Sequence, residues 1–269
     1  MPRRLEPESW ALPTLFSSSG CFETMRAYEG KIFRLGEHLQ RLAASAQYLG
    51  LTAPTTEELA MRLRRALAKS KIREAVVRIA LIPDDARIAS PSIVIDEISP
   101  PPPALYAKGI RVAIVPTRRF PVSQIDPEAK FSARLGSKMA VMEAQLRGAD
   151  EAIFTDGAGY VTESTASNLG MMYHGTFIAA PCWQGLLAGV TWQALVQLAA
   201  DLRIPYREMP VSRHELYNAD EAFMTSTIKE VLPVTMIDGR RIGNGRPGPQ
   251  TTRLLKAFRR LVRKELKLS

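Results

Sequence analysis

Residues 130–163, K-F-S-A-R-L-G-S-K-M-A-V-M-E-A-Q-L-R-G-A-D-E-A-I-F-T-D-G-A-G-Y-V-T-E, are the stretch from which the rest of the chain can be interpreted. Lys130 stands just before a helical segment, a hairpin follows, and the stretch ends on Glu163. An amine and a carboxylate from neighbouring elements suit a carbonyl cofactor, which needs a Schiff base at one end and a proton held at the other. The stretch therefore predicts a cofactor site built around Lys130 and Glu163.

The local pattern inside this stretch predicts a helix and a β-hairpin. The helix spans 136–147 and stops at Gly148, and the hairpin turns on a D-G pair. Lys138, the rival amine, lies on the predicted helix, and we interpret it as part of a solvated face. Glu143 is expected to support the helix or an ion pair rather than to touch a cofactor.

The composition is that of an ordinary globular protein. The 269 residues are 46% apolar and 23% charged, which suffices for one large or two modest domains with buried cores. No run of about 18 apolar residues occurs, and the first ten residues lack the apolar region of a signal peptide. Cys21 and Cys182 form no C-x-x-C pattern. We therefore expect a cytoplasmic protein with no membrane span, no disulfide scaffold and no metal site.

The net charge of +9 raises the alternative of a non-enzymatic protein that binds nucleic acid. The positive residues are spread along the chain, with clusters at 62–65 and 259–264, and aromatic residues are not interleaved with them in a stacking pattern. We interpret the clusters as solvated helix faces and expect no nucleic-acid partner. An anionic cofactor and anionic substrates also suit a basic chain.

Periodicity predicts an α/β first half. Apolar residues recur at helical spacing over 38–49, and T-T-E-E at 55–58 is a capping-box pattern that opens a second helix toward Ser70. Strands are predicted for C-F-E-T-M-R-A-Y (21–28), A-V-V-R-I-A-L-I (75–82) and I-R-V-A-I-V (110–115). The run S-P-P-P-P-A before the last strand is stiff and cannot pair in a sheet.

The second half alternates turn signals with short apolar runs. Its predicted strands cover 171–180, with a turn at H-G, then 204–211, 221–227 and 234–242, with a turn at D-G. Its predicted helices begin at Gly189, at Ser212 with a glutamate three residues on, and at Thr251.

The common catalytic motifs are absent from the sequence. The histidines His38, His174 and His214 show no H-E-x-x-H spacing, and no G-x-S-x-G serine lies near them. Neither a Walker motif nor the G-x-G-x-x-G of a dinucleotide fold occurs. What remains is the lysine described above and a set of groups that suit a phosphate.

Three features could hold a phosphate dianion, which is bound by N–H groups at a helix N-terminus, by hydroxyls and by a fixed guanidinium. Gly189 allows a close backbone approach at a helix start, where Val190 and Thr191 present N–H groups and a hydroxyl. The T-S-T run at 225–227 ends an apolar strand, and Arg41 lies on the first helix. Taken singly, each feature is more often a cap, a turn or a helix-face residue.

Five blocks of sequence in register resemble the class IV, or fold type IV, pyridoxal-phosphate enzymes. The blocks are H-L-Q-R-L-A-A-S-A (38–46), Lys130 with E-A-x-x-x-G-A-D-E-A-I (143–153), V-T-E-S-T-A-S-N-L (161–169), A-G-V-T (188–191), and F-M-T-S-T-x-x-E-V-L-P-V with I-D-G-R (223–240). The resemblance spans roughly residues 20–258. This group comprises branched-chain aminotransferases, D-amino acid aminotransferases and aminodeoxychorismate lyases.

The resemblance implies a role for each site residue. Lys130 is expected to form the Schiff base with pyridoxal 5'-phosphate, and Glu163 to bind the pyridine nitrogen and keep it protonated. The phosphate and cofactor contacts that the resemblance implies are Arg41, Gly189, Val190, Thr191, Ser226 and Thr227. Phe22 and Arg78 are the expected substrate contacts, with a structural ion pair as the open alternative for Arg78.

Several positions depart from the family pattern and leave the substrate open. The branched-chain enzymes carry a tyrosine five residues after the lysine, where this chain has Leu135, and Tyr-x-Arg where it has V-V-R (76–78). Trp192 stands where an arginine usually follows G-I-T, and Gly170 stands where N-L-F usually ends. The R-L pair at 134–135 is more similar to the lyases, whereas the C-terminal run from F-M-T-S-T to G-N-G-R-P-G-P is more similar to the aminotransferases.

The sequence therefore predicts a two-domain α/β protein of fold type IV. We expect a smaller N-terminal α/β domain (1–116), an interdomain linker (117–126) and a larger C-terminal cofactor-binding domain with a barrel-like sheet (127–269). The predicted activity moves an amino group between an amino acid and a 2-oxo acid through a Schiff base on Lys130, in a homodimer that the resemblance implies. Aminodeoxychorismate lyase activity, which releases pyruvate and gives 4-aminobenzoate, is the first alternative, and nucleic-acid binding is the second.

Overall fold

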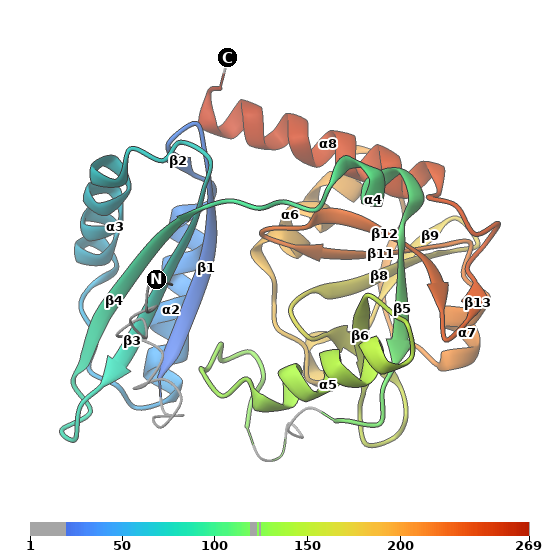
Figure 1. The fold of residues 1–269 in the computed structure, drawn as a ribbon, viewed down its shortest axis with the longest axis horizontal. Helices are drawn as coiled ribbons and strands as arrows, with labels where there is room; N and C mark the ends of the chain where they lie inside the picture. Colours follow the sequence, from blue (N-terminus) through green and yellow to red (C-terminus); the bar gives the residue numbers. More distant parts are fainter. Residues whose placement is uncertain (1–19, 119–122, 124, 269) are drawn as a thin grey trace, which may run out of the picture. The chain divides into compact units, whose positions relative to one another are not determined.

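The structure, a computed structural model, describes residues 20–118, 123 and 125–268. Part of the predicted linker at 117–126 lies outside the described residues, as do the first residues of the predicted N-terminal domain. Figure 1 shows the helices and strands by label.

The chain divides into two compact units. Among the described residues, the first unit contains residues 20–98 and 129–134, and the second contains those of residues 99–128 and of the chain from Leu135 onward. This division differs from the predicted domains in two places, because residues 99–116 belong to the second unit and the segment around Lys130 belongs to the first.

Within the described residues the first unit is a four-stranded antiparallel sheet with two helices on one face (Figure 1). The sheet has the order β2-β1-β3-β4. Buried and half-buried side chains alternate along β1, and the buried set packs with the apolar faces of α2 and α3 in one core. The elements are β1 (Cys21–Tyr28), β2 (Lys31–Ile32), α2 (Leu35–Tyr48), α3 (Thr56–Ser70), β3 (Ala75–Pro83) and β4 (Ala89–Glu97).

Local signals in this unit match the structure, with one omission. The hydroxyl of Thr55 accepts the N–H of Glu58 at 3.2 Å and caps α3 as predicted. Strand β4 was not predicted, because Pro91 and its flanking serines interrupt the apolar alternation. Since β4 pairs with β3 alone in the described sheet, it is an edge strand, where a proline is tolerated.

The second unit holds a nine-stranded sheet in the part of the chain that the structure describes. Its order is β10-β9-β8-β11-β12-β5-β6-β7, with β13 paired to β12. The N–H of Val161, the first residue of β7, donates to the carbonyl of Val211, just past β10, at 2.8 Å. The two edges of the sheet therefore meet, and the sheet is barrel-like as predicted.

The strands and helices of the second unit are largely those that the sequence predicts. The strands are β5 (Ile110–Ile114), β6 (Glu151–Thr155), β7 (Val161–Ser164), β8 (Asn168–Tyr173), β9 (Thr176–Ala179), β10 (Tyr206–Glu208), β11 (Glu221–Ser226), β12 (Glu230–Ile237) and β13 (Arg240–Arg241). The helices are α4 (Pro103–Lys108), α5 (Leu135–Leu146), the 3₁₀ turn η1 (Cys182–Gln184), α6 (Val190–Asp201), α7 (Arg213–Tyr217) and α8 (Pro249–Leu266). A complete capping box at Ser212 and Glu215 opens α7.

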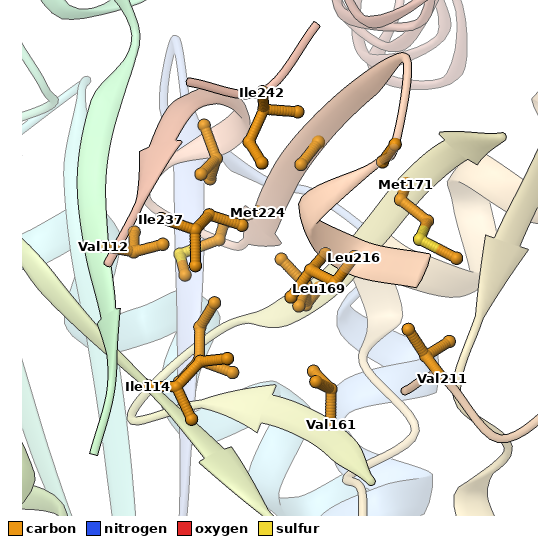
Figure 2. Close-up of a cluster of buried hydrophobic side chains, with 14 of the residues drawn as sticks. Val112, Ile114, Val161, Leu169, Met171, Val211, Leu216, Met224, Ile237 and Ile242 are labelled. Carbon is orange, nitrogen blue, oxygen red and sulfur yellow. The ribbon is translucent and has the colours of Figure 1, made fainter. Parts of the chain in front are cut away.

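Apolar side chains fill the interior of the curled sheet (Figure 2). They come from strands far apart in the sequence, such as Val112 on β5, Leu169 on β8 and Ile237 on β12, and Leu216 on α7 packs with them. This core explains why residues 99–116 belong to the second unit: β5 pairs in parallel with both β12 and β6. A short apolar run predicts a strand but does not reveal which sheet the strand joins.

Helix α8 is amphipathic and anchored at its start by a buried carboxylate. Glu221 accepts the N–H groups of Gln250 at 2.9 Å and Thr251 at 2.7 Å, and a Cβ added at Gly248 would overlap the carboxyl group of Glu221. The apolar side of the helix is buried and its basic residues face outward. In the described chain, no helix has the length and apolar character that crossing a bilayer demands.

The family departures at Gly170 and Trp192 are explained by one aromatic cluster. The rings of Phe177 and Trp192 lie 5.0 Å apart, and those of Phe177 and Phe223 lie 5.2 Å apart. A Cβ added at Gly170 would lie 2.7 Å from Phe177 and 2.8 Å from Phe223. The aromatic rings therefore occupy the room that a side chain at residue 170 would need.

We predict that Gly170→Ala lowers the free energy of unfolding by about 1–3 kcal/mol, because the packed rings must move to admit a methyl group. Gly136→Ala on α5 is the control, since a Cβ there meets nothing within 4 Å, and it should leave the free energy of unfolding unchanged or raise it by up to about 1 kcal/mol, because alanine favours a helix over glycine. Urea unfolding measures both values, and equal effects of the two substitutions would contradict the packing argument.

Candidate active site

Lys130 lies on an extended segment beside β1 in the first unit. Its carbonyl accepts the N–H of Phe22 at 3.0 Å, and its own N–H donates to the hydroxyl of Ser45 on α2 at 3.0 Å. The ammonium nitrogen Nζ lies 4.9 Å from the centre of the Phe22 ring. Lys130 is half-buried, so its backbone is fixed at both ends and its amine lies over an aromatic face.

The rival amine Lys138 is exposed on α5, as the sequence analysis expected. Glu143 on the same helix accepts the hydroxyl of Thr117 at 2.5 Å and the N–H of that residue at 3.3 Å. Its carboxylate thus ties α5 to the chain that follows β5.

Arg41 is held by a carboxylate that the sequence analysis did not single out. Its Nε donates to Glu23 Oε1 at 2.6 Å and its Nη2 to Glu23 Oε2 at 2.9 Å, a two-point pair between α2 and β1. The Nδ1 of His38 donates to Glu23 Oε2 at 2.8 Å. Glu23 lies between Cys21 and Met25 on the buried face of β1. A charged residue at a position where the alternation predicts a buried apolar one is the sequence signal that could have revealed Glu23.

The charges of this cluster follow from burial and pairing. Burial alone would raise the pKa of Glu23, but the hydrogen bond from His38 and the charge and hydrogen bonds of Arg41 lower it to about 2. For His38, burial lowers the pKa, and the charges of Arg41 and Lys130 act in the same direction while Glu23 opposes them. At neutral pH the cluster therefore consists of a carboxylate, a guanidinium and a neutral imidazole.

The two predicted substrate residues lie on the other face of the β1–β3 ladder. Phe22 pairs with Ala80 and Thr24 pairs with Arg78, so Phe22 and Arg78 are two positions apart on one face. Arg78 donates to Asp96 at 2.7 Å and is exposed. It therefore forms the ion pair that the sequence analysis left as its alternative role.

Glu163 is buried on β7 in the second unit, and Asn168 connects it to the start of α6. The carboxylate oxygen Oε2 accepts the side-chain amide of Asn168 and the N–H of Leu187, both at 3.2 Å. The same amide of Asn168 donates to the carbonyl of Leu187 at 2.7 Å. A Cβ added at Gly189 would overlap the side-chain oxygen of Asn168, so the chain can pass this amide only with a glycine there.

The residues of the second unit that are predicted to bind the phosphate lie around the same asparagine, Asn168. Gly189 is the N-cap of α6, and Val190 and Thr191 form its buried first turn, where helix N–H groups have no intrahelical acceptor. Asn168 pairs with Thr225 across the β8–β11 ladder, directly before the predicted contacts Ser226 and Thr227. Strand pairing therefore brings the T-S-T run next to the strand that carries Asn168.

These residues fit pyridoxal 5'-phosphate. The hydroxyl oxygen of Thr225 is buried without a hydrogen-bond partner in the described structure, which is a cost unless a further polar group meets it. The first turn of α6 offers helix N–H groups that have no intrahelical acceptor, and such groups suit a phosphate. The buried carboxylate of Glu163 suits a protonated ring nitrogen.

Comparison with known sequences identifies the class of protein. Residues 20–237 match the sequence model of the family Amino-transferase class IV. The chain is 36% identical over 253 residues to a protein of Methanocaldococcus jannaschii that carries the name of a putative branched-chain-amino-acid aminotransferase. This match covers 91% of the chain and 88% of its relative.

Solved structures give the same result. The branched-chain aminotransferase from Thermoproteus uzoniensis with norvaline is similar with a TM-score of 0.87 and 34% identity, over 95% of this chain and 90% of that one. The branched-chain amino acid aminotransferase from Thermobaculum terrenum in its pyridoxal-phosphate form is similar with a TM-score of 0.84 and 26% identity, over 91% of this chain and 85% of that one. The predicted fold type IV is confirmed.

The chain is therefore a pyridoxal-phosphate-dependent transaminase, and it belongs to the class IV aminotransferases. The predicted reaction, amino transfer between an amino acid and a 2-oxo acid, is confirmed at this level. The comparisons favour it over both the lyase and the nucleic-acid-binding hypotheses.

The buried Glu23 predicts how stability depends on pH. Because folding lowers its pKa from 4.5 to about 2, its contribution to the free energy of unfolding is complete above pH 4.5 and is lost as the pH falls toward 2. At about 1.4 kcal/mol per pH unit this contribution is on the order of 3 kcal/mol. Glu23→Gln should therefore cost more stability at about pH 6 than at about pH 3. Urea unfolding at both values measures this cost, and a cost independent of pH would refute the argument.

Proposed function

We propose that the enzyme transfers the amino group of branched-chain amino acids to a 2-oxo acid, with Lys130 as the Schiff-base lysine. The observation that carries the proposal is the hydrogen-bonded connection of Glu163 through Asn168 to the N-terminus of α6. This connection joins the carboxylate of Glu163, which suits a protonated ring nitrogen, to the helix start at α6, which suits a phosphate. The substrate class is supported by the names of the relatives above.

Lys130 and Glu163 handle protons in this proposal. Bound pyridoxal 5'-phosphate supplies an electron sink that stabilises negative charge on the substrate Cα. Glu163 holds a proton at the ring nitrogen, because a buried carboxylate favours a cationic partner. Lys130 moves the proton of the substrate Cα on its Nζ, and its backbone contacts to Phe22 and Ser45 fix the origin of that side chain.

The phosphate is assigned to groups that hold it independently of Lys130. The N–H groups of the α6 start carry the positive end of the helix dipole, and the hydroxyls at the end of β11 add further donors. The fixed guanidinium of Arg41 supplies the full charge. The assigned contacts are Arg41, Gly189, Val190, Thr191, Ser226 and Thr227.

An apolar substrate side chain suits the surroundings of Lys130. The ring of Phe22 lies 4.9 Å from its Nζ and offers an aromatic wall beside the reacting amine. Arg78 is already paired with Asp96 on the same face of the sheet. We therefore assign substrate contact to Phe22 and a supporting ion pair to Arg78.

A homodimer is supported by an apolar stripe on α5. Large apolar side chains at spacings of four, three and four residues share one face of this helix. They are Leu135, Met139, Met142 and Leu146, exposed by 73%, 49%, 62% and 89%. A contiguous exposed apolar surface marks an interaction site, and we assign this one to a second copy of the chain.

A cytoplasmic location is part of the proposal. Both cysteines are free thiols, as is usual in a reducing compartment. Recovery of the protein in a secreted or membrane fraction on cell fractionation would contradict this location.

The substrate proposal predicts a half-reaction. L-leucine, L-isoleucine or L-valine, added without a keto acid, should shift the visible absorbance of the holoprotein into the near-ultraviolet, and 2-oxoglutarate should restore it, because a transaminase alternates between two cofactor forms. D-leucine is the matched control for hand and L-aspartate for side-chain polarity. If no amino acid produces the shift while aminodeoxychorismate yields pyruvate and 4-aminobenzoate, the protein is a lyase.

Glu163→Gln should retain bound cofactor but lose turnover by about two orders of magnitude or more, because an amide cannot stabilise a proton on the ring nitrogen. Steady-state kinetics and absorbance of the purified variant measure the two quantities. Glu221→Gln, which removes another buried and multiply bonded carboxylate, is the control for general destabilisation. Near-normal turnover in Glu163→Gln would show that another group holds the proton.

Met142→Glu should convert the dimer into a monomer, because the charge would be desolvated in an apolar contact. Light scattering coupled to size exclusion measures the mass. Met61→Glu is the matched control, since Met61 is 63% exposed on α3 and lies outside the stripe. A dimer that survives Met142→Glu would place the interface elsewhere.

A further inference from the structure

A chain of hydrogen bonds joins Glu23 to Lys130 within the first unit. Glu23 holds the guanidinium of Arg41 at two points, at 2.6 Å and 2.9 Å. The carbonyl of Arg41 accepts the hydroxyl of Ser45 at 2.9 Å, and that hydroxyl accepts the N–H of Lys130 at 3.0 Å. The residue before Glu23, Phe22, holds the carbonyl of Lys130 at 3.0 Å. Two successive residues of β1 therefore control the arginine and the lysine segment.

The burial of this cluster leaves the guanidinium of Arg41 few alternative orientations. The Glu23 side chain is 0% exposed, that of His38 is 2% exposed and that of Arg41 is 13% exposed. A two-point pair fixes the plane of a guanidinium as well as its position. His38 donates a third bond to the same carboxylate, which in turn fixes the rotation of Glu23 itself.

We propose that Glu23 is a positioning residue: it orients the guanidinium of Arg41 toward the cofactor phosphate, while Ser45 on the same helix sets the place of Lys130. This inference rests on the proposed function, because it takes Arg41 as a phosphate contact. Glu23 acts through Arg41 and does not itself touch the cofactor.

The sign of one effect separates positioning from simple electrostatics. Glu23 carries a negative charge next to the arginine. If only net charge mattered, its neutralisation would strengthen the binding of a phosphate dianion. If Glu23 positions Arg41, neutralisation releases the guanidinium and weakens that binding. The two accounts predict opposite outcomes for Glu23→Gln.

The test compares pyridoxal 5'-phosphate with pyridoxal, which lacks the phosphate. Absorbance titration of the cofactor-free full-length chain gives an association constant for each, and the ratio of the phosphate form to pyridoxal measures phosphate recognition. A role confined to fold stability would weaken both ligands and leave the ratio unchanged. We expect Glu23→Gln and Arg41→Ala each to lower the ratio by about tenfold to a hundredfold, the range of a charge-assisted hydrogen bond.

The double variant measures the energetic coupling between Glu23 and Arg41 in phosphate recognition. Glu23→Gln combined with Arg41→Ala should lower the ratio no further than Arg41→Ala alone, because both changes remove one interaction. Glu221→Gln is the matched control in the second unit, where a buried carboxylate also accepts several hydrogen bonds, and it should leave the ratio unchanged. Arg41→Lys and Glu23→Asp, which keep the charges but not the two-point geometry, replace any variant that does not fold.

The contact between Ser45 and Lys130 is tested by a separate measurement. Ser45→Ala keeps the Glu23–Arg41 pair and removes the acceptor of the Lys130 N–H. It should leave the ratio unchanged and slow the reaction of Lys130 with pyridoxal, followed by stopped-flow absorbance. An unchanged rate would show that Ser45 does not set the place of Lys130.

The remaining outcomes distinguish the inference from its premise. If Arg41→Ala lowers the ratio and Glu23→Gln leaves it unchanged or raises it, the positioning role of Glu23 is wrong while the proposed function stands. If Arg41→Ala itself leaves the ratio unchanged, the phosphate assignment of Arg41 fails, and the role of Glu23 fails with it.

Discussion

A carboxylate that is removed from water must be met by hydrogen-bond donors, and each unit of this protein is built around that requirement. In the first unit Glu23 on β1 is satisfied by Arg41 and His38 from α2. In the second unit Glu163 on β7 is satisfied by Asn168 and by the N–H of Leu187. In each case these donors lie outside the strand that carries the carboxylate, so satisfying the charge also fixes how those parts of the chain pack.

The same requirement connects packing to chemistry. The side-chain amide of Asn168 donates a hydrogen bond to Glu163. The side-chain oxygen of Asn168 occupies the position that a Cβ at residue 189 would need. The glycine that this contact demands is also the N-cap of α6, where helix N–H groups suit an anion. The curled sheet then brings the end of β11 beside β8. Residues that are far apart in the sequence thus meet because the apolar interior of the sheet closes it (Figure 2).

Local chemistry could be predicted from the sequence, and spatial pairing could not. The cap at Thr55, the capping box at Ser212 and the hairpin turns depend on residues a few positions apart, so their patterns were sufficient. The partner of β5 on one side, β12, is far along the chain, and an apolar run does not name its partner. Glu23 escaped attention because its donors are contributed by another element. The roles of Lys130 and Glu163 were predicted from the register of five blocks and stay predictions, and the structure describes the surroundings of both residues.

Lys130 is the lysine that we propose binds the cofactor. Borohydride reduction of the holoprotein makes that bond permanent, and peptide mapping by mass spectrometry then locates it. We expect the reduced cofactor on Lys130, with loss of the visible absorbance band. A reduced cofactor on Lys138, the exposed lysine of α5, or on any other lysine would contradict this assignment.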